Sequence, residues 1–334
     1  MVIYPAELVL ILAALLDYGI GDPWDWWHPV QGMGWLISRY TQLALRALNS
    51  PIALWLAGVG LGVGLVLSSG LIGWLLVAVT KQFHPLAGLA TEVILLASCF
   101  AGRSLRDAAN EVLEPLQAGN LTKARSRLSR YVGRDTENLS EPEVLRAVLE
   151  TVTENATDGV MAPLFYAIAG AMIPAIGSVP LALGYKAAST LDSMVGYRTP
   201  PYTHLGWFSA KMDDVLTWVP CRLVVLTLSI VSGKPRRVWQ ICWRDASKDL
   251  SPNSGWSEAA YAAALGVQVG GTNWYRGVAK QKPLLGDQLR AICETIPTGI
   301  VPDHIFAALH LTRQCLMIWL AIAVLALSLS SRLD

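Results

Sequence analysis

Three carboxylates recur at four-residue intervals near the middle of the chain. On an α-helix, Glu150, Glu154 and Asp158 would share one face at the spacing i, i+4 and i+8. Like charges at this spacing repel by roughly 0.2–0.5 kcal/mol per pair, and Mg²⁺, an arginine or an ammonium group would relieve the repulsion. The alternative is a solvated acidic face. Asn155 and the break at Gly159 favour a site, so we predict Glu154 and Asp158 as metal ligands and Asn155 as a cofactor-binding residue.

A second group of ionisable residues lies at the end of an apolar segment. Lys186 and Asp192 flank small hydroxyl residues there. An ionisable residue at membrane depth is energetically costly and therefore a functional candidate, although Lys186 could equally extend its amine to the membrane surface. Asp213 and Asp214 precede another apolar run, where they could hold a metal or merely begin a helix. We predict Asp192 and Lys186 as catalytic residues, and Asp213 and Asp214 as metal ligands.

Several cations and small polar residues could bind an anion. Arg103 and Arg106 share a helix face, which suits phosphate or carboxylate binding but equally suits anchoring on the cytoplasmic side of a membrane. Arg134 lies in a predicted loop, and Asn253 and Ser254 lie in a predicted turn. The glycine-rich stretch 265–271 is predicted to be a loop whose backbone N–H groups could cradle an anion. We predict that five side chains bind a cofactor: Arg103, Arg106, Arg134, Asn253 and Ser254.

One histidine follows the first apolar run. His28 comes after Asp22 and the tryptophans at 24, 26 and 27, which are typical of a membrane interface. A single histidine is more often structural, but beside Asp22 we predict His28 as a catalytic residue.

These residues are embedded in a membrane-type composition. Hydrophobic residues make up 53% and charged residues 15%, against about 25% charged in ordinary soluble domains, and the mean hydropathy is +0.41. The net charge of +1 gives no argument for nucleic acid as a partner. The five scattered cysteines are predicted to be thiols in a reducing compartment.

The apolar runs predict an all-α fold, a polytopic helical membrane protein with helical cytoplasmic segments. Four to six spans are expected within residues 2–20, 52–80, 84–101, 160–185, 215–232 and 315–331, the fourth and fifth of which contain prolines. The glycines at 58, 60, 62 and 64 lie in an uncharged run, so they predict close helix packing rather than a dinucleotide site. We treat residues 1–334 as a single integral-membrane domain.

Two long polar stretches interrupt the spans, at 102–159 and 233–314. They carry 18 of the 26 Lys and Arg residues, which predicts that both face the cytoplasm. Within the first, Ser140, Pro142 and Glu143 predict a capped helix from about 142 to 158. If Asp158 and Asp192 serve one reaction, the segment 160–185 must fold back, because a straight helix of that length would separate them by roughly 39 Å.

Taken together, the motifs resemble the CobD/CbiB family, the adenosylcobinamide-phosphate synthases of cobalamin biosynthesis. The resemblance extends in order from about residue 17 to 286. It rests on Gly21-Asp22-Pro23 with His28-Pro29, Gly102-Arg103-Ser104-Leu105, Val132-Gly133-Arg134-Asp135-Thr136, Glu154-Asn155, Asp158-Gly159-Val160, Ala162-Pro163-Leu164-Phe165, Tyr185-Lys186, Thr190 to Tyr197, Asp213-Asp214, Ser251 to Gly255, Ala264-Leu265-Gly266 and Gly270-Gly271. Many members of the family are expected to have asparagine at the position of Ser189. This difference argues against a critical role for the Ser189 side chain.

The resemblance implies ATP-dependent amide formation. The carboxylate of adenosylcobyric acid would join the amine of aminopropanol phosphate, or of aminopropanol, with ATP and Mg²⁺ as cofactors. The composition and the Lys/Arg distribution predict a multi-pass protein of the cell membrane, in contact with lipid and with its active site towards the cytoplasm. Other late cobalamin-pathway membrane enzymes are candidate partners. The alternatives are a transporter, which broken apolar helices favour, and an anchoring subunit of a corrinoid-processing complex.

Overall fold

The computed structural model describes residues 4–21, 28–287 and 299–330. This part of the chain is almost entirely helical, with a single antiparallel strand pair, so the prediction of an all-α membrane fold is confirmed. Asp22, the tryptophans at 24, 26 and 27, and Cys293 lie outside the described residues. The other four cysteines are buried free thiols, as predicted.

The chain forms two compact units. Unit 1 comprises residues 1–103, 158–217 and 319–334, and unit 2 comprises residues 104–157 and 218–318. Three helices contribute residues to both units, and so does the π-helical turn that follows α7. These elements are α5 (Gly102–Gln117), α10 (Trp207–Val231), α13 (Pro302–Ser330) and the π-helix Ala156–Met161.

Unit 1 is helical wherever it is described. Its remaining helices are α1 (Ala6–Gly19), α2 (Pro29–Ala47), α3 (Pro51–Phe83), α4 (Pro85–Ala97), α8 (Ala162–Ala171) and α9 (Ser178–Val195). Each of α2, α3 and α4 begins on a proline, where a missing N–H costs nothing. The residue before each proline accepts a backbone hydrogen bond at the helix start through its side chain; these caps are His28, Ser50 and His84.

Close packing is confirmed for two of the four α3 glycines predicted to allow it, Gly58 and Gly62, whereas a Cβ on Gly60 would make only an ordinary contact and one on Gly64 would meet nothing within 4 Å. A Cβ on Gly58 would overlap the backbone carbonyl of Leu205, and one on Gly62 would overlap the ring of Phe208. Further along the helix, Gly73 faces Leu183 on α9 in the same way. Larger residues at these positions would therefore separate α3 from the segments that pack on it.

Among the residues that the structure describes, three helices are long and apolar enough to cross a membrane by length and composition: α3, α10 and α13. A fourth span is possible if α4 and α5, which are bent by 42° at their junction, count as one. Pro220 lies inside α10 and does not break it, so the expected span 215–232 lies almost entirely within one continuous helix. In contrast, α1 is shorter than the 20 residues or so that span the hydrocarbon layer.

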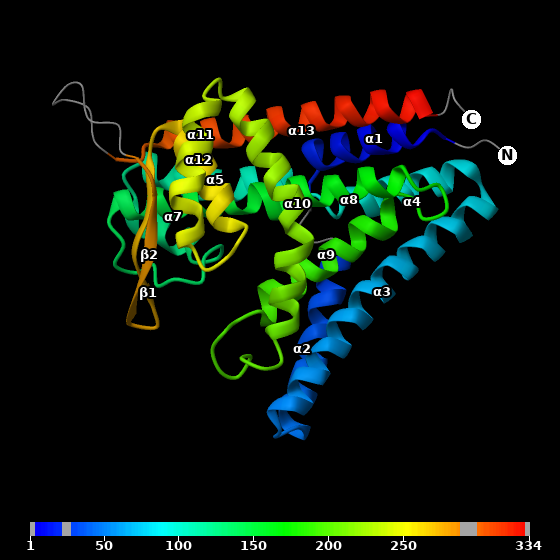
Figure 1. Ribbon diagram of the computed structural model, residues 1–334, viewed down its shortest axis with the longest axis horizontal. Helices are drawn as coiled ribbons and strands as arrows, with labels where there is room; N and C mark the ends of the chain where they lie inside the picture. The colour runs from blue at the N-terminus through cyan, green and yellow to red at the C-terminus, as the bar shows by residue number, and fades with distance from the viewer. Residues whose placement is uncertain (1–3, 22–27, 288–298, 331–334) are drawn as a thin grey trace. The chain divides into compact units, whose positions relative to one another are not determined.

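The proline-rich segment 160–185 folds back, as predicted. It forms α8, a turn at 172–177, and α9, which packs against α8 (Figure 1). The rings of Tyr166 and Tyr185 stack with centroids 5.0 Å apart and fix the register of this hairpin. Asp158 precedes Tyr166 and Asp192 follows Tyr185 by similar numbers of residues, so both aspartates lie at the end of the hairpin away from its turn.

Unit 2 is built around a small-residue helix. Besides its share of the helices named above, it contains α6 (Leu121–Leu128), α7 (Glu141–Asn155), α11 (Pro235–Asp245), the 3₁₀ turn Ala246–Lys248, α12 (Ser254–Leu265), β1 (Gln268–Tyr275) and β2 (Val278–Gly286). Most of α12 is buried, and its alanines allow α7, α11 and both strands to pack on it.

The start of α7 matches the sequence prediction. Glu143 accepts hydrogen bonds from the backbone N–H and hydroxyl of Ser140, both at 2.7 Å, which completes a capping box. The predicted helix to residue 158 is also formed, but its last turns are the π-helix Ala156–Met161.

The strand pair corrects one prediction. The stretch 265–271 is not a loop, because β1 begins at Gln268 and pairs with β2. An irregularity between Val269 and Gly271 resets the register, so that Gly271 lies opposite Lys282. Gly270 has a φ of +96° and lies against the Pro283 backbone, a position that a side chain would not fit. The glycines therefore serve strand pairing.

Candidate functional site

A buried ion pair joins α7 to the loop before it. The Glu150 carboxylate is 1% exposed and accepts a hydrogen bond from Arg134 Nη2 at 2.5 Å and from the Gly270 amide at 2.8 Å. Burial alone would raise the pKa of Glu150, but the charges of Arg134 and Lys282 and these hydrogen bonds bring the pKa below its usual value. Glu150 is therefore held in its charged form.

The loop that carries Arg134 also fixes the strand pair. Arg134 Nη1 donates to Asn273 Oδ1 at 2.9 Å, and the Asp135 carboxylate accepts the backbone N–H groups of Arg276 and Gly277 at 2.8 and 2.7 Å. Asp135 thus holds the turn between β1 and β2. The strand pair in turn brings Lys282 to the cluster.

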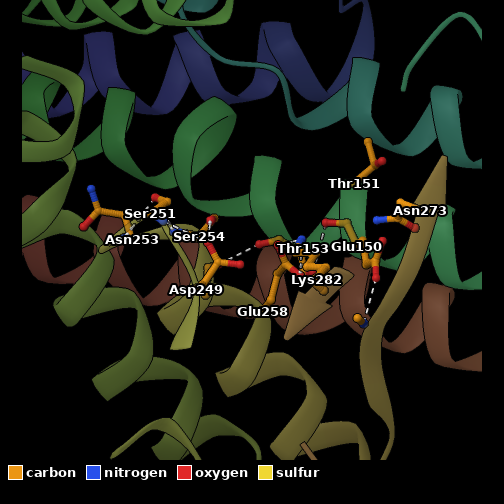
Figure 2. Close-up of polar contacts among 12 residues, drawn as sticks. Glu150, Thr151, Thr153, Asp249, Ser251, Asn253, Ser254, Glu258, Asn273 and Lys282 are labelled. Atoms are coloured by element: carbon orange, nitrogen blue, oxygen red, sulfur yellow. Dashed lines mark hydrogen bonds and ion pairs between the residues drawn. The ribbon is translucent and has the colours of Figure 1, made fainter. Parts of the chain in front are cut away.

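Lys282 and Glu258 form a second ion pair. Lys282 Nζ lies 2.6 and 2.8 Å from the two carboxylate oxygens of Glu258, whose side chain is fully buried. Figure 2 shows Lys282 between Glu258 and Glu150. Burial would lower the pKa of Lys282, but the surrounding glutamates raise it above its usual value, so the amine is protonated.

Glu154 differs from these two glutamates. In the described part of the chain its carboxylate accepts no hydrogen bond, although Lys282, Asp249 and Glu150 act on it electrostatically. Burial raises its pKa; Lys282 opposes this effect, whereas Asp249 and Glu150 reinforce it. Burial also raises the pKa of Glu258, to about 8, so Glu154 is distinguished from Glu258 by the absence of a hydrogen-bond donor in the described part of the chain.

A polar turn lies beside the cluster. The Asp249 carboxylate accepts the Ser251 N–H at 2.9 Å, and the Ser251 hydroxyl accepts the N–H groups of Asn253 and Ser254, both at 3.2 Å. Asn253 is buried, and its side-chain oxygen accepts a hydrogen bond from Arg222 Nη1 at 2.9 Å. The predicted binding residues Asn253 and Ser254 thus lie in one ordered turn at the start of α12.

The predicted site residues are divided between the two units. Unit 2 holds Glu154, Arg134, Asn155, Asn253, Ser254 and Arg106. Of these, Arg134, Asn253 and Ser254 belong to the ordered network just described. Asn155 is exposed and its side chain donates to the Thr151 carbonyl at 2.9 Å, while Arg106 lies 3.7 Å from Asp107.

Unit 1 holds the remaining predicted residues. Asp158 and Asp213 both act electrostatically on Tyr185, whose hydroxyl hydrogen-bonds Thr217 at 2.9 Å. Asp192 and half-buried Lys186 lie on α9.

The other predicted residues of unit 1 have local partners. Asp214 pairs with Lys211 at 3.1 Å. Arg103 donates to the Gly19 carbonyl. His28 caps α2 by accepting the Val30 N–H at 3.2 Å, a local structural contact.

The predicted magnesium ligands do not form a cage in the described residues. No group of three or more His, Cys, Asp or Glu side chains is arranged there to hold a metal. Mg²⁺ that arrives with a nucleotide needs only one or two carboxylates, because phosphate oxygens and water complete its shell. The Glu154 carboxylate, which accepts no hydrogen bond in the described part of the chain, could serve as such a single protein ligand.

Among the residues of these networks that were not predicted as site residues are Lys282, Arg222 and Glu258. Their partners are distant in sequence, and only the strand register and the packing of α12 bring them together. The sequence features that could have pointed to them are the position of Lys282 in a strand-like segment and that of Arg222 inside an apolar run.

Fold and site together define a multi-pass helical membrane protein with a polar unit that carries a buried ionic cluster. The family model for the CobD/Cbib protein matches residues 10–312, and the chain belongs to this family. The chain is 53% identical over 292 residues to the cobalamin biosynthesis protein CobD of Synechocystis sp., covering 87% of this chain and 85% of the relative.

Other relatives agree. Identity is 44% to CobD of Photorhabdus laumondii, covering 86% of this chain and 90% of the relative, and 40% to the cobalamin biosynthesis protein CbiB of Salmonella typhimurium, covering 92% and 97%. No solved structure matches the chain. Family membership assigns the protein a role in cobalamin biosynthesis.

Proposed function

We propose that the protein is an ATP-dependent acid–amine ligase, which joins the carboxylate of adenosylcobyric acid to the amine of aminopropanol phosphate and forms adenosylcobinamide phosphate. The observation that carries this proposal is the family match over residues 10–312, together with relatives named as cobalamin biosynthesis proteins. The sequence motifs that resemble this synthase family support the same reaction.

The chemistry requires activation of a poor electrophile. In the simplest sequence, a substrate carboxylate oxygen attacks the γ-phosphorus of ATP, and ADP leaves. The amine nitrogen then attacks the acyl carbon, inorganic phosphate leaves, and a base takes the proton lost by the nitrogen. Mg²⁺, when bound, would neutralise charge on the phosphates, and Glu154 is the residue of unit 2 that could help to hold it. One amide, one ADP and one phosphate form for each ATP.

Glu154 is the residue of unit 2 best suited to this chemistry. Its carboxylate accepts no hydrogen bond in the described part of the chain, whereas Glu150 and Glu258 are each held by a cation. Burial raises the pKa of Glu154, which makes it a stronger base than an exposed glutamate and suits a group that accepts a proton from the amine. The Glu154 carboxylate is also our predicted magnesium ligand. We therefore propose that it acts either as the general base for the amine or as a ligand of Mg²⁺.

The other predicted residues remain candidates within their own units. In unit 1 we propose Asp192, Lys186 and His28 as catalytic candidates, Asp158, Asp213 and Asp214 as metal-ligand candidates, and Arg103 as a phosphate-binding candidate. In unit 2, Arg106, Asn155, Asn253 and Ser254 remain candidates for binding the cofactor. Arg134 is committed to Glu150, so we propose that it positions the cluster rather than touching the nucleotide.

The test is stoichiometry with the purified protein in detergent. ADP and amide should form in a one-to-one ratio when adenosylcobyric acid, aminopropanol phosphate, ATP and Mg²⁺ are supplied. Glu154→Gln should lower turnover by about 100-fold or more, as expected when a general acid–base group is lost. Glu141→Gln, an exposed glutamate on the same helix, should leave turnover unchanged.

Two results would count against the proposal. Amide formed without ADP would remove the ligase mechanism. Corrinoid uptake by proteoliposomes, with no ATP-dependent amide formed, would favour the transporter alternative instead.

A further inference from the structure

An arginine lies inside the apolar helix α10 between two tryptophan rings. Arg222 Cζ is 4.9 Å from the ring centroid of Trp218 and 4.7 Å from that of Trp256. Its Nη1 donates to Asn253 Oδ1 at 2.9 Å. The guanidinium is thus held by two aromatic rings and at one corner by an amide, an arrangement that fixes its orientation.

Its charge is not neutralised within the part of the chain that the structure describes. There, Arg134 and Lys282 of the same unit each pair with a glutamate, but no carboxylate pairs with Arg222. A cation in an apolar helix is costly unless it is paired. Tryptophan faces and a neutral amide stabilise a guanidinium only partly, so the arrangement suits an anion supplied from outside.

The surroundings keep this arginine accessible and ordered. Arg222 is half-buried, and Trp218 is 50% exposed. Asn253 is itself fixed, because its N–H donates to Ser251 Oγ at 3.2 Å and its carbonyl accepts the Cys221 thiol at 3.3 Å. A guanidinium has five N–H donors in a rigid fork; Asn253 Oδ1 accepts from Nη1, and the side chain of the neighbouring Cys221 also interacts with the guanidinium, which leaves further donors of the fork for a ligand. Such a fork matches phosphate and carboxylate oxygens without further ordering.

We infer that Arg222 is an oxyanion-binding residue, which receives a phosphate or carboxylate group in the fork left open between Trp218 and Trp256. The chemistry is common to three substrate groups, namely the phosphate of the amine, the phosphates of ATP and the corrinoid carboxylate, and to the headgroup of an anionic lipid. The choice among the substrates rests on the proposed function.

The experiment compares Arg222→Gln and Arg222→Lys with wild type. Arg236→Gln is the matched control, because Arg236 is an exposed arginine of the same unit. Binding of aminopropanol phosphate, aminopropanol, ATP and adenosylcobyric acid is measured by calorimetry, without turnover, and KM is measured separately for each. Phosphatidylcholine vesicles with and without phosphatidylglycerol provide the lipid arm.

We expect Arg222→Gln to weaken one ligand by about tenfold or more, the cost of a lost charge-assisted hydrogen bond. Arg222→Lys, which keeps the charge but loses the fork, should fall between wild type and Arg222→Gln. If Arg222→Gln loses more affinity for aminopropanol phosphate than for aminopropanol, the bound anion is the phosphate of the amine. If it loses affinity for ATP, the anion is a nucleotide phosphate, and if it loses affinity for adenosylcobyric acid, the anion is the corrinoid carboxylate. A change confined to the phosphatidylglycerol vesicles identifies a lipid headgroup.

Unchanged affinities and unchanged lipid dependence in folded Arg222→Gln and Arg222→Lys would overturn the inference. The elution volume on size exclusion verifies that the variants are folded. Because binding is measured directly, an Arg222-dependent anion site would stand even if no ATP-dependent amide were formed. Conversely, normal ligase turnover with unchanged affinities would remove this site and leave the proposed function intact.

Discussion

Replacing Arg134 with methionine should destabilise unit 2 strongly. The change leaves the Glu150 carboxylate, only 1% exposed, with the Gly270 amide as its remaining hydrogen-bond donor. Removing one partner of a buried ion pair costs about 3–5 kcal/mol, because the other charge stays buried. In a unit of roughly 150 residues, each kcal/mol lowers the unfolding midpoint by about 2–4 °C. The midpoint should therefore fall by about 6–20 °C.

The assay is thermal unfolding of the purified protein, followed by circular dichroism. Arg130→Met is the matched control, since Arg130 and Glu111 form a pair at 2.9 Å with side chains 38% and 30% exposed. Exposed pairs contribute about 1 kcal/mol or less, so its midpoint should move by no more than about 4 °C. An unchanged midpoint in Arg134→Met, accompanied by a raised KM for ATP, would refute this reasoning and support the cofactor role first predicted for Arg134.

Three further outcomes are expected. Burial alone would raise the pKa of Asp245, but hydrogen bonds from Arg244, Lys248 and the Gly286 amide lower this pKa from 3.8 to about 2. The stability that the charged Asp245 contributes is therefore present above pH 3.8 and lost as the pH falls towards 2. In an acid titration of stability, the variant Asp245→Asn should lack this loss. Ser140→Ala should lower the free energy of unfolding by about 1 kcal/mol in denaturant titration, because the capping box is removed. Single cysteines at exposed Thr122 and Lys280, in a background without reactive thiols, should resist an impermeant reagent added outside intact cells; labelling of either would place its polar segment outside.

The features predicted correctly from sequence are those set by neighbouring residues. The capping box needs only Ser140 and Glu143, and the α3 glycines mark a packing face wherever their partners come from. The fold-back between 160 and 185 follows from the length of the segment and from its prolines. Such features depend on helix geometry, which the local sequence specifies.

The features that could not be predicted depend on contacts between distant segments. Gly270 and Gly271 resemble a loop locally, but pairing with β2 makes them part of a strand irregularity. Lys282 reaches Glu258 only because that irregularity sets the register. Pro220 resembles a helix breaker, yet α10 continues through it. The prediction for Arg134 identified a cation but not that Glu150, sixteen residues away, engages it.

The glycine face of α3 also constrains the order in which the chain assembles during synthesis. Gly62 leaves the ribosome 146 residues before Phe208, whose ring covers it. At about 5–20 residues per second, this interval is roughly 7 to 30 s. For that time a helix long enough to span the bilayer presents an uncovered small-residue face, of the kind that associates readily with other helices. A nascent chain that stalls before residue 178 would keep this face open, and it would be prone to pair with another copy of itself.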